Sequence, residues 1–233
     1  MAETGEPWVD LNADLGEEVT DDLALLAVVT SANVACGYHA GSAAIMRQVC
    51  AEAVRLGVSI GAQVSYADRT HFGRVARDVA GPILTEQVAD QVGTLAVIAA
   101  QEGTSVRYVK PHGALYHRVT TDHDQASAVL AGSGRLPVLG FPGAALLVRA
   151  AQDGRVCWQE GFPDRAYTLE GRLVPRDQPG ALVTDATEVA ARAVALAGSV
   201  HSVCVHGDSP GAVATAGAVR AALVSAGLEL RGL

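Results

Sequence analysis

The sequence alternates short runs rich in β-branched and apolar residues with longer Ala- and Leu-rich stretches of helical periodicity. This rhythm is typical of repeated βα units that build a parallel sheet, and about seven such units can be counted. We predict strands at residues 8–12, 28–35, 58–64, 105–109, 136–141, 156–159 and 200–205. All of these strands except the fifth run directly into polar residues, so their ends are candidates for a functional site.

Helices are expected between these strands, at residues 42–56, 85–102, 185–197 and 210–226. Thr85 provides a start signal, and Gly57 and Gly103 provide stop signals. Residues 166–174 instead predict a small β-hairpin inserted after the sixth strand, which could cover a site as a lid. Because no linker or longer repeat interrupts the pattern, we expect residues 1–233 to form a single domain.

Two architectures share this rhythm: an open doubly wound sheet and a closed or nearly closed barrel. A doubly wound sheet concentrates its ligand contacts near one switch point, whereas a barrel recruits most strand ends. Polar residues follow most strands here, and no GxGxxG motif follows the first strand. The pattern therefore favours the barrel over a dinucleotide-binding fold.

Charge and composition exclude several classes of function. The formal net charge is −8 and no basic run is present, which argues against nucleic acid or an anionic membrane surface as a partner. The four cysteines form no CxxC pair and are expected to be reduced and mostly buried. The first six residues do not resemble a secretory signal, and no stretch approaches the roughly 20 apolar residues of a membrane-spanning helix. We therefore expect a cytoplasmic protein.

The first strand carries polar residues on alternate positions. Asp10, Asn12 and Asp14 share one face, while the intervening residues are apolar. Burying three polar side chains is costly unless they meet a cation, a substrate or one another. We predict a catalytic role for Asp14 and substrate contacts for Asp10 and Asn12. The alternative is that Asp14 or Asn12 caps the following helix.

The second and fourth strands lead to histidines and a lysine. His39 lies in a glycine-rich stretch just before a helix that starts at Ser42, although a lone histidine is often only structural. Lys110 follows an apolar strand and precedes a proline, so its ammonium group should face a carboxylate or an anionic ligand. We predict catalytic roles for His39, Lys110 and His112. The alternative for Lys110 is a structural ion pair with a first-strand aspartate.

The sixth and seventh strands end in further charged residues. Glu160 is followed by Arg165, and His206 shares a strand face with Asp208. We predict that Glu160 and His206 are catalytic and that Arg165 and Asp208 bind substrate. The following Ser209-Pro210 could begin a helix that binds an anion, although such helix starts are also common without a function. Because five strand ends deliver a carboxylate, a histidine or a lysine, we expect these groups to meet in one cavity suited to hydrolysis.

Six stretches, in matching order across almost the whole chain, resemble the LamB/YcsF family, understood as the A subunit of bacterial ATP-dependent 5-oxoprolinase. They are DLNADLGE from Asp10, SANVACGYHAG from Ser31, IGAQVSYADRTHFGR from Ile60, VKPHGALYH from Val109, EGFPDRAYTLEGRLVPR from Glu160 and CVHGDSP from Cys204. The resemblance implies a distorted (β/α)7-type barrel, related to glycoside hydrolases and polysaccharide deacetylases. It also implies that 5-oxoproline, ATP and water give glutamate, ADP and phosphate, in a complex with subunits B and C.

The family motifs add Asn33, Gln63 and Arg74 to the residues expected to bind substrate. Two positions depart from the family pattern: Ala13 stands where the family usually has Cys, and Gln63-Val64-Ser65 stands where it often has His-Pro-Gly. Gln63 is a poor metal ligand, so the resemblance leaves open whether a catalytic metal is bound. Self-association of the chain is also left open.

The mechanism that we expect begins with ATP-dependent phosphorylation of the lactam carbonyl, followed by attack of water. Asp14 or Glu160 would be the general base, the histidines would orient water and move protons, and Lys110 and Arg165 would hold negative charge. ATP, with Mg²⁺, is the expected cofactor; because the chain contains no Walker A motif, the ATP chemistry could lie mainly on partner subunits, and the sequence leaves open which subunit binds ATP. Two rival hypotheses are a metal-dependent deacetylase or amidase that acts without ATP, and a non-catalytic subunit that binds a small lactam or sugar.

Overall fold

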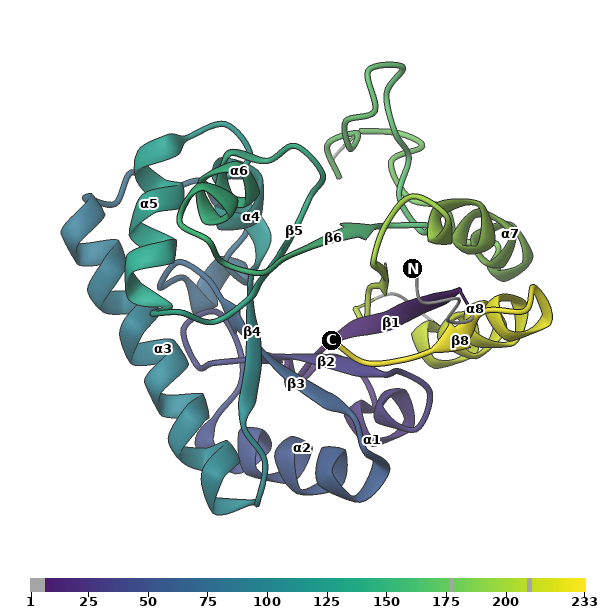
Figure 1. Ribbon diagram of the computed structural model, residues 1–233, viewed down its shortest axis with the longest axis horizontal. Coiled ribbons are helices and arrows are strands. Elements are labelled where there is room, and N and C mark those ends of the chain that lie inside the picture. The colour runs from purple at the N-terminus through teal and green to yellow at the C-terminus, as the bar shows by residue number, and fades with distance from the viewer. Residues whose placement is uncertain (1–6, 177, 209–210) are drawn as a thin grey trace, which may run out of the picture.

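The computed structural model describes residues 7–176, 178–208 and 211–233. Its centre is a closed barrel of seven parallel strands (Figure 1). The strands are β1 (Trp8–Leu15), β2 (Ser31–Ala35), β3 (Ser59–Val64), β4 (Val106–Pro111), β5 (Val138–Gly140), β6 (Cys157–Gly161) and β7 (Ser202–Val205). The barrel closes because β1 pairs with both β2 and β7. This confirms the predicted barrel and excludes the open doubly wound sheet.

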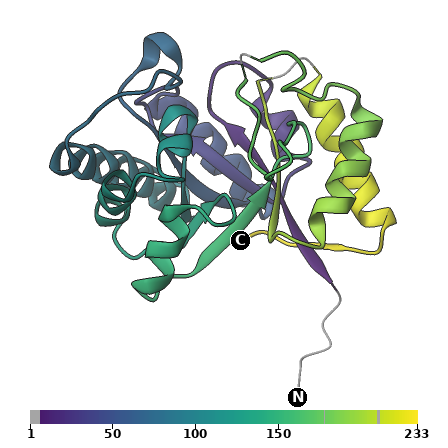
Figure 2. The ribbon, with the colours of Figure 1, turned by 90° about the horizontal axis from the view of Figure 1, so that it is seen from above.

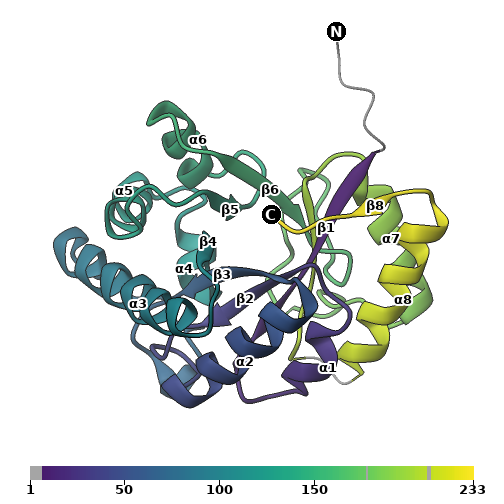
Figure 3. The same ribbon diagram turned by 60° about the horizontal axis from the view of Figure 1, so that its bottom comes forward.

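Helices surround the strands, as Figures 2 and 3 show from two further directions. They are α1 (Asp22–Leu26), α2 (Ala43–Leu56), α3 (Gly81–Gln101), α4 (Gly113–Arg118), α5 (His123–Gly132), α6 (Ala145–Gln152), α7 (Ala186–Ala197) and α8 (Ala212–Ser225), with a short 3₁₀ helix η1 (Arg69–His71) after β3. A short strand, β8 (Glu229–Leu230), pairs with the start of β1. Among the described residues, no helix is both long and apolar enough to cross a membrane.

The two faces of β1 explain how the barrel is built. Val9, Leu11 and Ala13 belong to the main hydrophobic core. Asp10 and Asn12 alternate with them and bond to side chains of other strands inside the barrel. The barrel interior is therefore polar along this strand, and the apolar face packs outward, as parallel strands covered by helices require.

Several predicted boundaries need correction. Helix α3 begins at Gly81 rather than Thr85, because Pro82 in the first turn fixes the backbone dihedral that starts a helix. Strand β2 begins at Ser31 rather than residue 28, since the preceding residues form a turn in which Thr30 bonds to β1. The predicted helix at 42–56 is confirmed, with Ser42 as its N-cap. The predicted start of the last helix, at residue 210, lies outside the described residues.

Between β6 and α7, residues 162–176 and 178–184 extend away from the barrel strands (Figure 1). An antiparallel bridge between Tyr167 and Leu173 forms the expected hairpin, which turns at Gly171 with a positive φ of 74°. A second bridge, between Arg165 and Leu182, closes the base of the segment. The four cysteines are free thiols, and three of them are buried.

Candidate active site

A cavity of about 640 Å³ opens where the carboxyl ends of the strands meet. Seven residues predicted from the sequence lie in its wall: Asp14, Arg74, Lys110, His112, Arg165, His206 and Asp208. Asp14 and Lys110 lie at the carboxyl ends of β1 and β4, and the others come from segments that follow β3, β4, β6 and β7. The structure therefore brings together side chains that are far apart in the sequence, at the end of the barrel where such folds place their active sites.

Lys110 is the centre of a buried ion network on the cavity floor. Its Nζ lies 2.9 Å from Oε2 of Glu160 and 3.3 Å from Oδ1 of Asp14. The same ammonium lies 3.2 Å from the Sγ of Cys204 and 3.3 Å from Oδ1 of Asn12. The side chains of Lys110 and Glu160 are 3% and 0% exposed, so this is a desolvated network rather than a surface pair.

Amide and hydroxyl groups support this network from inside the barrel. The Nδ2 of Asn33 donates to Asp14 at 2.9 Å and to Asn12 at 2.7 Å. Asn12 in turn donates to Ser202 at 2.6 Å, and the Ser202 hydroxyl bonds to Asp10. The chain of hydrogen bonds thus runs from the barrel interior to the carboxylate that faces the cavity.

The first-strand aspartates therefore split into two roles. Asp14 reaches the cavity, whereas Asp10 and Asn12 do not contribute to its wall. Asp10 accepts hydrogen bonds from Thr30 and Ser202, and Asn12 donates to Ser202, so the structure places both residues inside the barrel, and their contact with substrate stays a prediction. Asn33, also absent from the wall, acts on Asp14 in the same indirect way. The capping alternative is also wrong, because Asp21 caps α1.

The environment sets the charge of each group. Burial raises the pKa of Asp10 to about 6. The hydrogen bonds from Ser202 and its other partners lower this pKa, but burial has the larger effect. Burial would also raise the pKa of Asp14, but the positive charge of Lys110 reverses the direction and holds that pKa below its usual range. For Lys110, burial lowers the pKa, and the charges of Asp14 and its other acidic neighbours outweigh it, so the pKa lies well above its usual value. Asp14 and Lys110 are consequently both charged at neutral pH.

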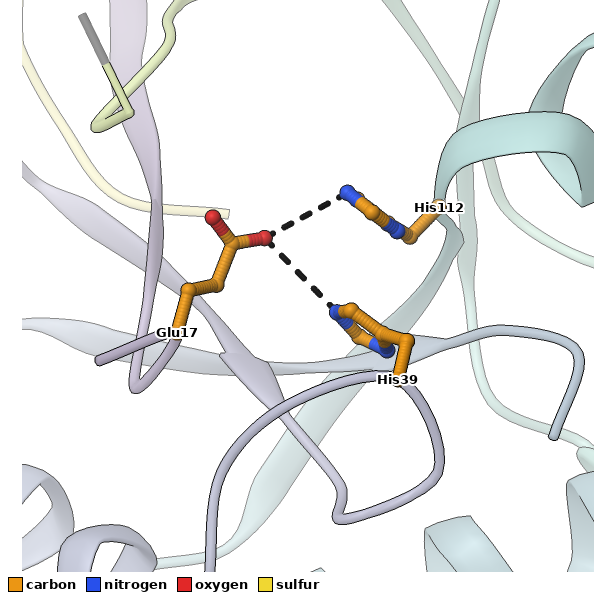
Figure 4. Close-up of side chains that lie close together, drawn as sticks. All are labelled: Glu17, His39 and His112. Atoms are coloured by element: carbon orange, nitrogen blue, oxygen red, sulfur yellow. Dashed lines mark ion pairs between the residues drawn. The ribbon is translucent and has the colours of Figure 1, made fainter. Parts of the chain in front are cut away.

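A second cluster lies beside the lysine network and includes a residue that the sequence analysis did not select. The Oε1 of Glu17 lies 3.4 Å from Nε2 of His112 and 3.7 Å from Nε2 of His39 (Figure 4). The two imidazole rings stack with centroids 4.1 Å apart. The amide of Gln63 bonds to both Glu17, at 2.9 Å, and His39, at 3.2 Å. His39 and Gln63 are thus near the cavity but behind its wall.

Glu17 escaped prediction because it lies beyond the strand. Strand β1 ends at Leu15, and Gly16 adopts a positive φ of 74°, which only glycine tolerates easily. The turn directs Glu17 back into the site, where alternation along the strand no longer predicts which way a side chain points. The glycine-glutamate pair at the end of the first motif was the available signal.

The cavity rim is built from arginines around one carboxylate. Asp208 bonds to Arg74 and lies 3.0 Å from the guanidinium of Arg176. Burial opposes ionisation of Asp208, but the charge of Arg176 and the hydrogen bond from Arg74 lower its pKa to about 2. Arg176, on the segment after the hairpin, was not predicted as a site residue.

His206 and Arg165 complete the wall. The Nδ1 of His206 lies 2.8 Å from Oδ2 of Asp164, which also accepts from the His206 backbone. Arg165 is buried, and one of its nitrogens donates to the carbonyl of Val174 at 2.7 Å. Its Nε has no partner among the described residues, so this guanidinium retains a donor for a ligand. The predicted Ser209-Pro210 anion site lies outside the described residues.

Comparison with known proteins identifies the family. The LamB/YcsF family model matches residues 9–233. The chain belongs to the LamB/YcsF family. A curated relative, the 5-oxoprolinase A subunit of Streptomyces griseus subsp. griseus, is 54% identical to this chain. The alignment covers 96% of this chain and 98% of the relative. The family resemblance noted in the sequence is therefore confirmed.

Solved structures agree with the fold of this LamB/YcsF protein. The crystal structure of a lactam utilization protein from Thermus thermophilus is 34% identical and superposes with a TM-score of 0.90, covering 97% of this chain and all of that one, 100%. A family 4 carbohydrate esterase from Streptomyces lividans, 14% identical, has a TM-score of 0.54 and covers 97% of this chain and 92% of its own. The second likeness concerns the fold alone, and it confirms that the barrel resembles the fold of a carbohydrate esterase.

Proposed function

We propose that this chain hydrolyses 5-oxoproline to glutamate as the A subunit of an ATP-coupled complex with subunits B and C. The observation that carries the proposal is the buried Asp14–Lys110–Glu160 network at the floor of a cavity that has arginines on its rim. The names of the relatives support it, since one is a 5-oxoprolinase A subunit and another is a lactam utilization protein.

The reaction requires activation because an unstrained amide is a poor electrophile. In the proposed sequence, the terminal phosphoryl group of ATP moves to the lactam oxygen and ADP leaves. Water then attacks the ring carbon, the C–N bond breaks, and the freed amine takes up a proton. A second water cleaves the resulting acyl phosphate, which releases glutamate and phosphate.

The wall residues suit these steps. Asp14 is ionised and faces the cavity, whereas Glu160 is fully buried, so Asp14 is the better placed general base. Lys110 supplies a desolvated positive charge to an oxyanion that develops beside it. The guanidinium groups of Arg165 and Arg176 offer donors for the substrate carboxylate or for a phosphoryl group.

His112 is suited to orienting the attacking water. Burial and the neighbouring His39 lower its pKa well below the usual value for histidine. The ring is therefore neutral at physiological pH and can form a hydrogen bond without adding a charge to the site. We assign ATP binding to the partner subunits, because the sequence has no phosphate-binding glycine motif.

The deciding experiment measures glutamate formation and ADP release from 5-oxoproline and ATP, with the chain alone and with the products of neighbouring genes. We expect turnover only in the complex, and we expect Asp14→Asn to reduce it by at least about 10²-fold, as loss of a general base does. Asp78→Asn is the matched control, because the Asp78 side chain is 95% exposed. Full turnover by the Asp14 variant would remove this residue from the mechanism.

A second candidate is a metal-dependent amidase that acts without ATP, which the Glu17–His39–His112 cluster favours. The same assay separates the two functions, since this candidate predicts glutamate formation by the chain alone in the absence of ATP. Binding of 5-oxoproline by calorimetry, without turnover in the complete complex, would instead indicate a non-catalytic binding subunit.

A further inference from the structure

Three buried side chains point their donor atoms at one place in the cavity wall (Figure 4). Glu17 comes from the turn after β1, His39 from the loop after β2, and His112 from the end of β4. One ligand atom from each residue lies within 4.8 Å of the other two. Because the three come from distant parts of the chain, the fold itself assembles this cluster.

The cluster lacks a countercharge. Lys110 is engaged by Asp14 and Glu160, and no lysine or arginine forms an ion pair with Glu17 among the described residues. Glu17, His39 and His112 are all buried, so water does not compensate the charge of the carboxylate. A divalent cation would compensate the carboxylate and accept lone pairs from neutral imidazole rings.

The spacing of the Glu17 oxygen from each imidazole nitrogen suits a shared ion. Metal bonds of about 2.1 Å to imidazole nitrogen and carboxylate oxygen, at tetrahedral angles, separate neighbouring ligand atoms by about 3.4 Å. The Glu17–His112 and Glu17–His39 distances are 3.4 and 3.7 Å. Gln63, whose amide lies 3.2 Å from Nε2 of His39, offers a further oxygen at the same place.

The backbone around these three residues adopts unfavourable conformations and is tightly packed. The non-glycine residues with positive φ in the described chain are Glu18, at 64°, and Phe72, at 57°. Glu18 follows Glu17 directly, and the Phe72 ring packs edge-on against both imidazoles. Gly73 has no room for a side chain, because a Cβ would lie 2.3 Å from the hydroxyl of Ser65 and 3.0 Å from Cβ of His39. Strain of this kind concentrates at functional sites.

We propose that Glu17, His39 and His112 bind one divalent first-row transition metal ion, of the class of Zn²⁺, Co²⁺ or Mn²⁺, in the wall of the substrate cavity. Two imidazoles and one carboxylate select such ions over Mg²⁺ and Ca²⁺, which prefer oxygen ligands alone. Since Glu17 and His112 line the same cavity as Lys110, the ion would face the molecule that binds in this cavity. The proposal does not depend on the reaction proposed above, because its test measures the metal.

The second ring nitrogens indicate how tightly the ion is held. Neither Nδ1 atom of the two histidines has a hydrogen-bond partner among the described residues. Partners at that position are worth about 10–100-fold in metal affinity. We therefore expect an ion that exchanges and that a chelator removes, so purification without chelators is needed to retain it.

The test uses the full chain, purified without chelators for metal analysis and then stripped and titrated with Co²⁺. We expect one equivalent of metal as purified, and a visible Co²⁺ absorption band that saturates at one equivalent and that Zn²⁺ displaces. Glu17→Gln, His39→Gln and His112→Gln should each weaken binding by more than about 100-fold, beyond the effect of an outer partner. His117→Gln, which changes an exposed cavity histidine outside the cluster, should bind as the unsubstituted chain does.

The proposal is overturned if the stripped chain binds neither Co²⁺ nor Zn²⁺ at one equivalent, or if the His112 variant binds like the His117 control. Circular dichroism and thermal unfolding of each metal-free variant show whether the barrel has folded. If Glu17→Gln fails to fold, Glu17→Asp keeps the charge and shortens the side chain, and it should still weaken binding. Because none of these measurements uses 5-oxoproline or ATP, their outcome is independent of whether the chain hydrolyses a lactam.

Discussion

The barrel interior and the cavity rim use the same residue types under different conditions. Asp10 in the interior is fully buried, has only neutral hydrogen-bond donors, and has a pKa raised to about 6. Asp208 on the rim is partly exposed, meets two arginines, and has a pKa lowered to about 2. The difference shows that the nature of the partner, together with depth, decides the charge of a carboxyl group. The comparison predicts that changes to buried charged groups of the interior alter stability strongly, whereas changes to the ion pairs on the rim alter it little.

The largest effect is expected when the interior network loses its cation. Lys110→Met leaves Asp14 and Glu160 buried without their common partner, which we expect to lower the free energy of unfolding by about 3–5 kcal/mol at neutral pH and to abolish turnover. The deficit should shrink as the pH falls, because Asp14, whose pKa is no longer held down by Lys110, then takes up a proton. Denaturant unfolding between pH 4 and pH 8 measures both effects.

Adding Glu160→Gln to the Lys110 variant provides the control for this first prediction, since it removes one uncompensated charge and should restore part of the lost stability. A loss below about 1 kcal/mol in Lys110→Met would show that the network is solvated like a surface pair. The contrast between interior and rim would then be wrong.

A smaller, pH-dependent effect is expected at Asp10. Its pKa is higher in the folded chain, about 6, than the ordinary value of 3.8, so the folded state binds more protons between these values. Stability contributed by the protonated group is complete below about pH 4 and is lost as the pH rises through 6, which amounts to about 3 kcal/mol. Asp10→Asn should lack this loss, so its stability relative to the unsubstituted chain should increase from pH 4 to pH 7. Parallel pH profiles in urea unfolding would contradict the assignment.

The smallest effect is expected on the rim. Arg176→Gln removes one of two arginines from Asp208, in a region where the Arg74 side chain is 42% exposed. We expect a change in unfolding free energy within about 1 kcal/mol that diminishes with added salt, because solvent and ions screen such pairs. If unfolding curves showed a loss as large as that of Lys110→Met, the rim would have to be treated as part of the buried network.

Much of the fold could be predicted from the sequence because it depends on repeating patterns. Strands β1, β3, β4, β6 and β7 lie where apolar runs end in polar residues, and the polar face of β1 points into the barrel as alternation requires. Short elements such as α1 and β8 escaped prediction because they contain too few residues to show a period. The boundary of α3 was missed because Pro82 begins the helix one turn before the predicted cap.

The candidate site was predictable where a side chain belongs to a strand and less so where a turn directs it. Asp14 and Lys110 lie on strands, and both reach the cavity as expected. Glu17 and Arg176 follow turns, whose direction depends on tertiary contacts that a single sequence does not encode locally. Asp10 lies inside the barrel and not in the cavity wall, because alternation gives the face of a strand but not the depth at which a side chain lies along the barrel.

The segment between β6 and α7 supplies five residues to the cavity wall: Phe162, Arg165, Leu173, Pro175 and Arg176. None of its described residues pairs with the seven barrel strands. Insertions or deletions near Gly171 can therefore change which molecules are admitted without disturbing the register of the sheet. The buried network of Asp14, Lys110 and Glu160 lies outside this segment, so the outer part of the cavity can diverge while that network is kept.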